Sequence, residues 1–203
     1  MTPLLDLPGV SRETVERLRS LHALLIKWNP AINLVSRTTV QTAWDRHIVD
    51  STQIYQLGHT DGHWADLGSG GGFPGLVIAC MALGRGDPIR VTLVESDQRK
   101  ATFLRTASAQ LGLETNVISQ RIEQVPPLQA RTLSARALAP LGVLLGYAAR
   151  HLSPQGLCLF PKGATWRREV ELARKDWHFD LDVHQSTTDS DGAILSVKAI
   201  SHV

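Results

Sequence analysis

The 203-residue chain has only two cysteines, and no apolar run approaches the ~18 residues that cross a bilayer. Cys80 and Cys158 both lie in apolar segments, so we expect two buried thiols and neither a disulfide nor a metal pair. No cysteine–histidine spacing matches a zinc site, and we expect no bound metal. The N-terminus lacks the basic start and apolar stretch of a signal peptide. These absences argue against a membrane-spanning or disulfide-stapled protein and predict a cytoplasmic one.

The chain also has little excess of one charge sign over the other. The chain has 21 Lys and Arg against 19 Asp and Glu, a formal net charge of +2. With 43% apolar and 20% charged residues it is composed like a globular protein, which excludes a disordered, collagen-like or coiled-coil chain. Such a weak overall charge permits a nucleic-acid partner without demanding one, so any phosphate-binding surface must be local.

Residues 1–60 show only helical patterns, and we expect them to form an N-terminal helical cap. Ser11 is a suitable N-cap for a first helix, which Asn29-Pro30 is expected to stop. A second helical pattern follows and ends near Gly58.

Residues 61–203 alternate strand and helix patterns, which is typical of a parallel sheet with helices on both faces. We expect Ser153–Gly156 to be a turn before one of the strands. The last two strand patterns, WHFDLDVHQ and AILSVKAI, have no room for a crossover between them and must pair antiparallel. The prediction is a single α/β domain: a doubly wound, mostly parallel seven-stranded sheet with an antiparallel C-terminal hairpin, preceded by the cap.

A glycine-rich turn, DLGSGGGFPG, carries the strongest chemical signal. It joins a strand to a helix, at the place where open α/β sheets bind ligands. Gly70 to Gly75 satisfies the pattern G-x-G-x-x-G, and Glu95 lies about 20 residues further on, as a dinucleotide fold expects. One interpretation is therefore a nicotinamide-dependent oxidoreductase.

The longer frame, Asp66-x-Gly68-x-Gly70-x-Gly72, fits S-adenosyl-L-methionine enzymes instead. There Asp66 would lie near the amino group of the ligand, and Glu95 would accept bonds from its ribose hydroxyls. Too little chain remains for a dehydrogenase substrate domain, and the closing hairpin is typical of methyltransferases. We therefore favour a Rossmann-like, class I S-adenosylmethionine methyltransferase with residues 61–203 as its catalytic core. A non-catalytic RNA-binding module with the same fold is a third possibility.

Seven segments of the chain resemble the RsmG family, also called glucose-inhibited division protein B: KWNPAINLVS, RHIVDS, DLGSGGGFPG, VESDQRKATFLR, SQRIEQ, SARA and PKG. The likeness runs from about Leu24 to Lys198. It implies a cytoplasmic enzyme that transfers a methyl group from S-adenosylmethionine to N7 of one guanine in a conserved loop of 16S ribosomal RNA. Separately, we expect a monomer. The implied partner is 16S ribosomal RNA or the small ribosomal subunit. The chain departs from the family where Asp191–Ser196 lacks a common arginine.

The resemblance also implies roles for single residues. Gly68 and Phe73 would line the cofactor, Ile122 and Glu123 would lie beside its adenine, and Arg136 would reach toward the reacting end. Together with the glycine turn and the acid after the next strand, the expected cofactor contacts are Asp66, Gly68, Ser69, Gly70, Gly72, Phe73, Glu95, Ser96, Ile122, Glu123 and Arg136.

Guanine N7 has a lone pair and no proton, so its methylation needs no general base and depends mainly on positioning. The candidate catalytic residues are Arg136, His47 and Asn33. His47 and Asp50 share a helix face, where they either frame the mouth of the site or tie the cap to the sheet. Asn33 either caps a helix or touches RNA.

Three basic residues are candidates for RNA binding. Lys162 follows a strand end at the same sheet edge as the glycine turn, and we expect it to contact phosphate. Arg99 and Lys100 lie on a basic helix face that either binds RNA or is merely solvated.

Overall fold

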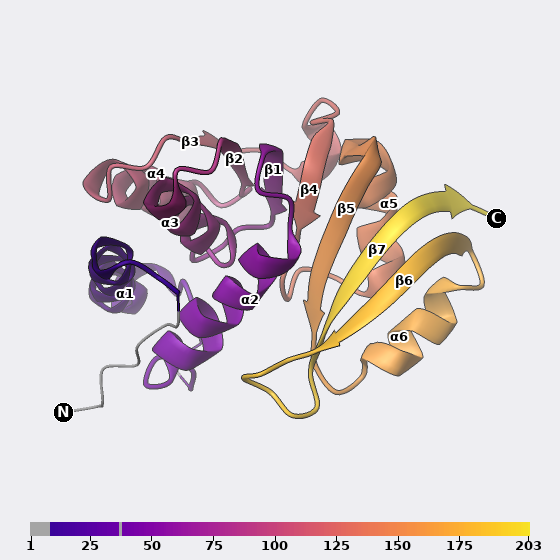
Figure 1. Cartoon of the computed structure of the whole chain (residues 1–203), viewed down its shortest axis with the longest axis horizontal. Helices are drawn as coiled ribbons and strands as arrows, with labels where there is room; N and C mark the ends of the chain where they lie inside the picture. Colours follow the sequence, from indigo (N-terminus) through magenta and orange to yellow (C-terminus); the bar gives the residue numbers. More distant parts are fainter. Residues whose placement is uncertain (1–8, 37) are drawn as a thin grey trace.

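A seven-stranded sheet forms the centre of the computed structural model, which describes residues 9–36 and 38–203. Its strands are β1 (Gly62–Leu67), β2 (Ile89–Val94), β3 (Thr115–Ile118), β4 (Ala130–Ser134), β5 (Leu152–Lys162), β6 (Trp177–Gln185) and β7 (Ala193–His202). The order is β3-β2-β1-β4-β5-β7-β6, with the first five parallel and β7 antiparallel to both of its neighbours. The predicted doubly wound, mostly parallel sheet with a C-terminal antiparallel hairpin is confirmed (Figure 1).

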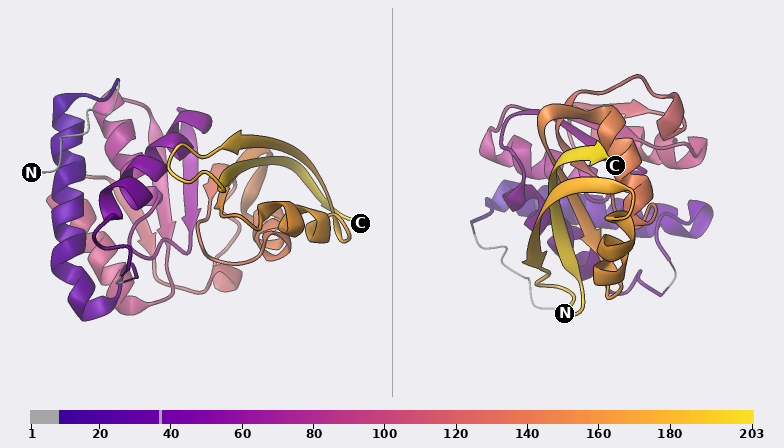
Figure 2. Two further views of the ribbon diagram at one scale, coloured as in Figure 1. Left: turned by 90° about the horizontal axis from the view of Figure 1, so that it is seen from below. Right: turned by 90° about the vertical axis from the view of Figure 1, so that its right-hand side faces the viewer.

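Helices cover both faces of this sheet. They are α1 (Arg12–Ile32), the π-helix η1 (Trp44–Val49), α2 (Asp50–Leu57), α3 (Gly75–Arg85), α4 (Gln98–Gln110), the 3-10 turn η2 (Ile122–Gln124), α5 (Leu141–His151) and α6 (Trp166–Ala173). The buried residues of α1, α2, α3 and α4 form one core cluster, and those of α5 and α6 form a second. In Figures 1 and 2, α1 and the β6–β7 hairpin lie at opposite ends of the long axis.

Strand β5 shows how the sheet serves both cores. Leu157 and Leu159 belong to the first cluster, and Cys158 and Phe160 belong to the second, as the alternation of side chains along a strand requires. Cys158 is fully buried and free, and so is Cys80 in α3. The prediction of two buried thiols is confirmed. Within the described ranges, no helix is both long enough and apolar enough to span a bilayer.

Helix α1 begins where the sequence predicts but ends later. Ser11 caps it through its side chain. The helix continues through Pro30, and Asn33 ends it in the left-handed conformation with φ of 48°. Asn33 N donates to the Asn29 carbonyl at 3.0 Å, and the Asn29 side chain accepts from Val35 N at 2.8 Å. A stop at Asn29-Pro30 is therefore wrong: a proline near the helix end removes one donor, and Asn29 fixes the exit one turn further on.

The expected turn at Ser153–Gly156 is also wrong, because these residues lie within β5. The pairing with β4 is irregular there: Ala130 pairs with Leu152, and Thr132 pairs with Leu157. A Cβ on Gly156 would lie 2.5 Å from the Leu152 side chain and 2.9 Å from the Ala130 carbonyl oxygen. Proline and glycine thus mark a bulge in a continuing strand.

Candidate active site

The glycine turn between β1 and α3 is held by hydrogen bonds to the end of β2. Ser69 N donates to the Val94 carbonyl at 3.0 Å. Glu95 accepts from Gly70 N through Oε2 and from Asp97 N through Oε1, both at 2.8 Å. The backbone of Gly68 and Gly70 has φ of 66° and 54°, which favours glycine. Glu95 therefore fixes the turn that the sequence places beside it.

Asp66 lies underneath this turn and is completely buried. Its Oδ1 accepts from the Ser134 hydroxyl at 2.7 Å, and its Oδ2 accepts from Gly75 N at 3.3 Å. Burial raises the pKa of Asp66 from 3.8 to about 6, although these hydrogen bonds oppose the shift. One oxygen thus bonds to the end of β4 and the other to the start of α3, and Asp66 does not line the cleft above the turn, so its contact with a ligand amino group stays a prediction.

A cleft of about 390 Å³ opens above the turn, and we call it the glycine cleft. It is lined by residues predicted to bind the cofactor, Gly68, Ser69, Gly70, Phe73, Glu95, Ser96, Ile122, Glu123 and Arg136, and by Lys100, which was predicted to bind RNA. Gly72 does not line it, because its α-carbon faces the protein interior, where a Cβ would lie 2.4 Å from Leu76. The cleft is also lined by residues that the sequence did not indicate: Leu34, Val35, Gly71, Val94, Gln120, Arg121, Ala137, Leu138 and Tyr147.

Tyr147 is one of the cleft residues that the sequence did not indicate. Its hydroxyl donates to Glu123 Oε1 at 2.6 Å, which lowers the pKa of Glu123. Tyr147 lies in α5, packed from the second face of the sheet, and nothing in its own segment indicates that it reaches η2. A contact of this kind depends on the tertiary fold.

Arg136, in the loop after β4, lies where the cap meets the sheet, and its side chain is 17% exposed. Its guanidinium donates to the Arg46 carbonyl at 2.8 Å and to His47 Nδ1 at 2.7 Å. The Asp50 carboxylate lies 3.7 Å away, and the Phe73 ring centroid lies 5.6 Å from the guanidinium carbon. The guanidinium of Arg136 is thus fixed in position between Arg46, His47 and Asp50 of the cap on one side and Phe73 of the glycine turn on the other.

His47 is buried and stacks on Phe73, with 5.2 Å between ring centroids. Burial, together with the charge of Arg136, lowers the pKa of His47 to about 3. The imidazole is therefore neutral at physiological pH, with Nδ1 accepting from Arg136. His47 and Asp50 do not bond to each other. Both meet Arg136, which ties the cap to the sheet and favours that interpretation of the RHIVDS motif.

Asn33 and Lys162, which were predicted to belong to the catalytic and RNA-binding sites, make hydrogen bonds within the protein. Asn33 ends α1, and the residues after it, Leu34 and Val35, line the glycine cleft. Lys162 Nζ donates to the Ala139 carbonyl at 2.8 Å and to Glu169 at 2.7 Å, and its side chain is 9% exposed. An RNA contact by either residue stays a prediction. The exposed Arg99 pairs with Asp97 at 3.5 Å.

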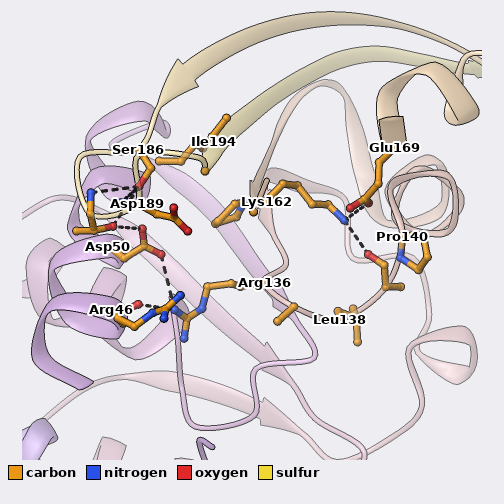
Figure 3. A pocket seen from close by; sticks show the side chains of 17 residues that line it. Arg46, Asp50, Arg136, Leu138, Pro140, Lys162, Glu169, Ser186, Asp189 and Ile194 are labelled. Atoms are coloured by element: carbon orange, nitrogen blue, oxygen red, sulfur yellow. Dashed lines mark hydrogen bonds and ion pairs between the residues drawn. The ribbon is translucent and has the colours of Figure 1, made fainter. Parts of the chain in front are cut away.

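A second cavity of about 500 Å³, which we call the hairpin cavity, lies on the other side of Arg136 (Figure 3). It is bounded by the cap, the loop after β4, the end of β5 and the β6–β7 loop. Its lining residues are Arg46, Asp50, Arg136, Ala137, Leu138, Ala139, Pro140, Pro161, Lys162, Gly163, Glu169, Ser186, Thr188, Asp189, Gly192, Ala193 and Ile194. Residues 136–138 line both cavities, so the two meet at this segment. In residues 9–36 and 38–203, no three His, Cys, Asp or Glu side chains cluster as a metal site.

Comparison with known proteins gives matches in sequence and in fold. A family model described as rRNA small subunit methyltransferase G matches residues 14–196. A relative of that name from Cereibacter sphaeroides is 51% identical over 96% of this chain and 94% of its own length. Another, from Ruegeria pomeroyi, is 46% identical over the whole of both chains.

Solved structures resemble the fold at much lower identity. A SAM-dependent methyltransferase from Aquifex aeolicus has a TM-score of 0.59 and 12% identity, covering 77% of this chain and 91% of its own. A TehB-like SAM-dependent methyltransferase from Corynebacterium glutamicum has a TM-score of 0.55 and 13% identity, covering 73% and 86%. The predicted Rossmann-like methyltransferase fold is confirmed, and the chain belongs to the rRNA small subunit methyltransferase G family.

Proposed function

We propose that this protein transfers a methyl group from S-adenosylmethionine to N7 of a guanine in a loop of 16S ribosomal RNA in the small subunit. Family membership supports the reaction class and the RNA. The observation that carries the proposal is the meeting of two cavities at Arg136, because a methyl transfer needs a donor site and an acceptor site in contact.

The residues of the glycine cleft suit this cofactor. A Cβ on Gly70 would meet no protein atom nearer than 3.8 Å, so its bare backbone faces open space. Each Glu95 oxygen accepts one backbone bond, which leaves lone pairs for ribose hydroxyls. Ile122 offers an apolar wall for adenine. When bound, S-adenosylmethionine supplies a sulfonium methyl group with a good leaving group.

The protein's own contribution is positioning. Guanine N7 carries its lone pair into the reaction, so no side chain has to remove a proton. His47 agrees with this, because its Nδ1 already accepts from Arg136 and its pKa, lowered to about 3, makes it a weak base. The Arg46 carbonyl and His47 fix the position of Arg136, and the Asp50 carboxylate, 3.7 Å away, offsets part of its charge, which reduces its repulsion of the cation that forms on the purine.

The order of the sheet favours methyl transfer over nicotinamide chemistry. A dinucleotide fold has strand order 3-2-1-4-5-6, whereas here β7 lies antiparallel between β5 and β6. Family membership points the same way. A non-catalytic RNA-binding module would not need a cleft lined by bare glycine backbone and a ribose-binding acid.

We further propose that the protein acts in the cytoplasm as a monomer and that Lys100 and Arg99 contact RNA phosphates. The decisive experiment maps N7-methylguanosine in 16S ribosomal RNA from cells with and without the gene. Purified protein is then incubated with radiolabelled S-adenosylmethionine and either naked RNA or small subunits. We expect one methylated guanine that disappears with the gene. An unchanged methylation map, or binding of NADH without binding of S-adenosylmethionine, would overturn the proposal.

A further inference from the structure

The hairpin cavity contains three carboxylates, and two of them are already engaged. Glu169 accepts from Lys162 Nζ at 2.7 Å and from Leu141 N at 2.9 Å. Asp50 accepts from the Thr188 hydroxyl at 2.8 Å and faces Arg136. For Asp189, by contrast, the described residues provide one donor, Asp191 N, which lies 3.1 Å from Oδ1. Its Oδ2 is left for another partner.

Asp189 is held in place by its backbone rather than by its carboxylate. Ser186 Oγ accepts from Asp189 N at 3.2 Å, and the Asp189 carbonyl accepts from Gly192 N at 3.1 Å. The same loop is tied to α2, because Gln53 accepts from Thr187 N at 2.9 Å. Figure 3 shows the carboxylate of Asp189 directed into the cavity. It is therefore a fixed, half-buried acceptor beside the proposed reaction centre.

We propose that Asp189 recognises the acceptor base by accepting hydrogen bonds from the N1–H and the N2 amino group of guanine. This inference rests on the proposed function. Guanine presents these two donors side by side, and an ionised carboxylate is an acceptor with two oxygens. Adenine presents a lone pair at N1, which the carboxylate repels. One side chain thus both selects guanine and rejects the other purine.

The same contact favours the reaction. Methylation at N7 places positive charge on the purine ring, which makes N1–H a stronger donor. A carboxylate at that edge therefore binds the transition state more tightly than the unmethylated base. Asp189 is a recognition residue with a direct effect on kcat, and it needs no proton transfer to act.

The test compares Asp189→Asn with Asp191→Asn, which makes the same charge change in the same loop. Asp191 is exposed, and only its backbone N–H contacts Asp189. Both variants and the wild type are given RNA carrying guanine or inosine at the target position, since inosine lacks the N2 amino group. We expect Asp189→Asn to lower kcat/KM on guanine by roughly 10- to 100-fold, the loss expected for a charged hydrogen bond. Asp191→Asn should match the wild type.

Discrimination between the two bases gives a second measurement. The wild type should prefer guanine over inosine by roughly tenfold or more, and Asp189→Asn should lose most of that preference. Affinity for S-adenosylmethionine, measured by calorimetry, and the Tm should be the same in all three proteins. A wild type that methylates inosine as well as guanine would overturn the inference, as would a fully active Asp189→Asn. If the wild type methylates neither RNA, the proposed function itself fails.

Discussion

The Arg136 guanidinium donates a hydrogen bond of 2.7 Å to His47 Nδ1, although the two residues lie 89 positions apart in the chain. Through this bond the cap and the loop after β4 form one wall, with the glycine cleft on one side and the hairpin cavity on the other. The bond requires a neutral histidine, and burial of the ring keeps it neutral. Local geometry and protonation state therefore depend on each other at this point.

Replacing Arg136 by lysine should harm activity more than stability. The guanidinium reaches the Arg46 carbonyl and His47 at once, and a lysine ammonium, as a single point, cannot reproduce that fork. We expect kcat/KM to fall by roughly 10- to 100-fold through misplacement of the wall, with a small change in Tm. Steady-state kinetics and thermal unfolding measure the two effects.

The matched control is Arg131→Lys at the amino end of β4. Arg131 also pairs with a carboxylate, Asp61, at 2.7 Å, but its side chain is 49% exposed and lines neither cavity. The Arg131→Lys variant should keep full activity. Equal losses of activity and stability in Arg136→Lys would assign Arg136 a purely structural role.

The depressed pKa of His47 should make the protein less stable in acid. Between pH 6.5 and about 3, the unfolded chain binds a proton at this residue and the folded chain does not. The stability that depends on neutral His47 is therefore present above pH 6.5 and is lost as the pH falls. Asp66 acts oppositely: its pKa is raised to about 6, so its contribution falls as the pH rises from 3.8 to about 6.

His47→Gln separates the two groups, because Asp66 titrates in both proteins and its contribution cancels in their difference. The glutamine carbonyl can still accept from Arg136, but it does not titrate. We expect the free energy of unfolding of the wild type, relative to the variant, to decline as the pH falls from 6.5 to about 5. Urea unfolding at a series of pH values gives this difference, and parallel curves would contradict it.

Two glycines offer a matched test of the glycine cleft. Gly68 and Gly86 have φ of 66° and 72°, so alanine costs about 1 kcal/mol of backbone strain at either site. A Cβ at Gly68 would also lie 2.6 Å from Leu138, which lines both cavities, whereas at Gly86 it meets nothing within 4 Å. We expect Gly68→Ala alone to weaken binding of S-adenosylmethionine, by roughly tenfold or about 1.4 kcal/mol. Calorimetry measures the affinity of each variant for S-adenosylmethionine. Equal affinities of Gly68→Ala and Gly86→Ala would argue against the glycine cleft as the cofactor site.

RNA binding should depend on salt, with Lys100 contributing to the slope. Lys100 lies beside Arg99 in the first turn of α4, and the loss of one phosphate contact lowers the slope of log K against log salt by about 1. We therefore expect a smaller slope for Lys100→Gln than for the wild type. Arg131→Gln removes a charge near the amino end of β4, away from α4, and should leave the slope unchanged. Filter binding from about 50 to about 200 mM salt measures it, and identical slopes for all three proteins would exclude Lys100 from the interface.

The sequence predicts those features that depend on local chemistry. Ser11 caps α1, Glu95 lies beside the glycine turn, and the last two strands pair antiparallel, each as expected. In these places a short segment contains both the signal and the structure that it specifies. The predicted helix stop at Asn29-Pro30 and the predicted turn at Ser153–Gly156 were wrong, because Pro30 and Gly156 interrupt isolated helices and strands more strongly than packed ones.

The site was predicted less completely for a related reason. Position in the glycine turn indicates that Asp66 and Gly72 belong to the site, but not that both face the interior. Tyr147 and Asp189 reach their cavities from segments with no motif of their own. Only the packing of α5 on the sheet, and of the β6–β7 loop on the cap, brings them there.

The position of β7 has a consequence for the order of folding. This strand lies inside the sheet, between β5 and β6, and the loop before it bonds to Asp50, 138 residues away from Thr188. Among the described strands β6 pairs with β7 alone, so β6 cannot join the sheet before β7 has paired with β5. The wall that this hairpin gives to the hairpin cavity therefore forms late, through contacts between residues far apart in the chain.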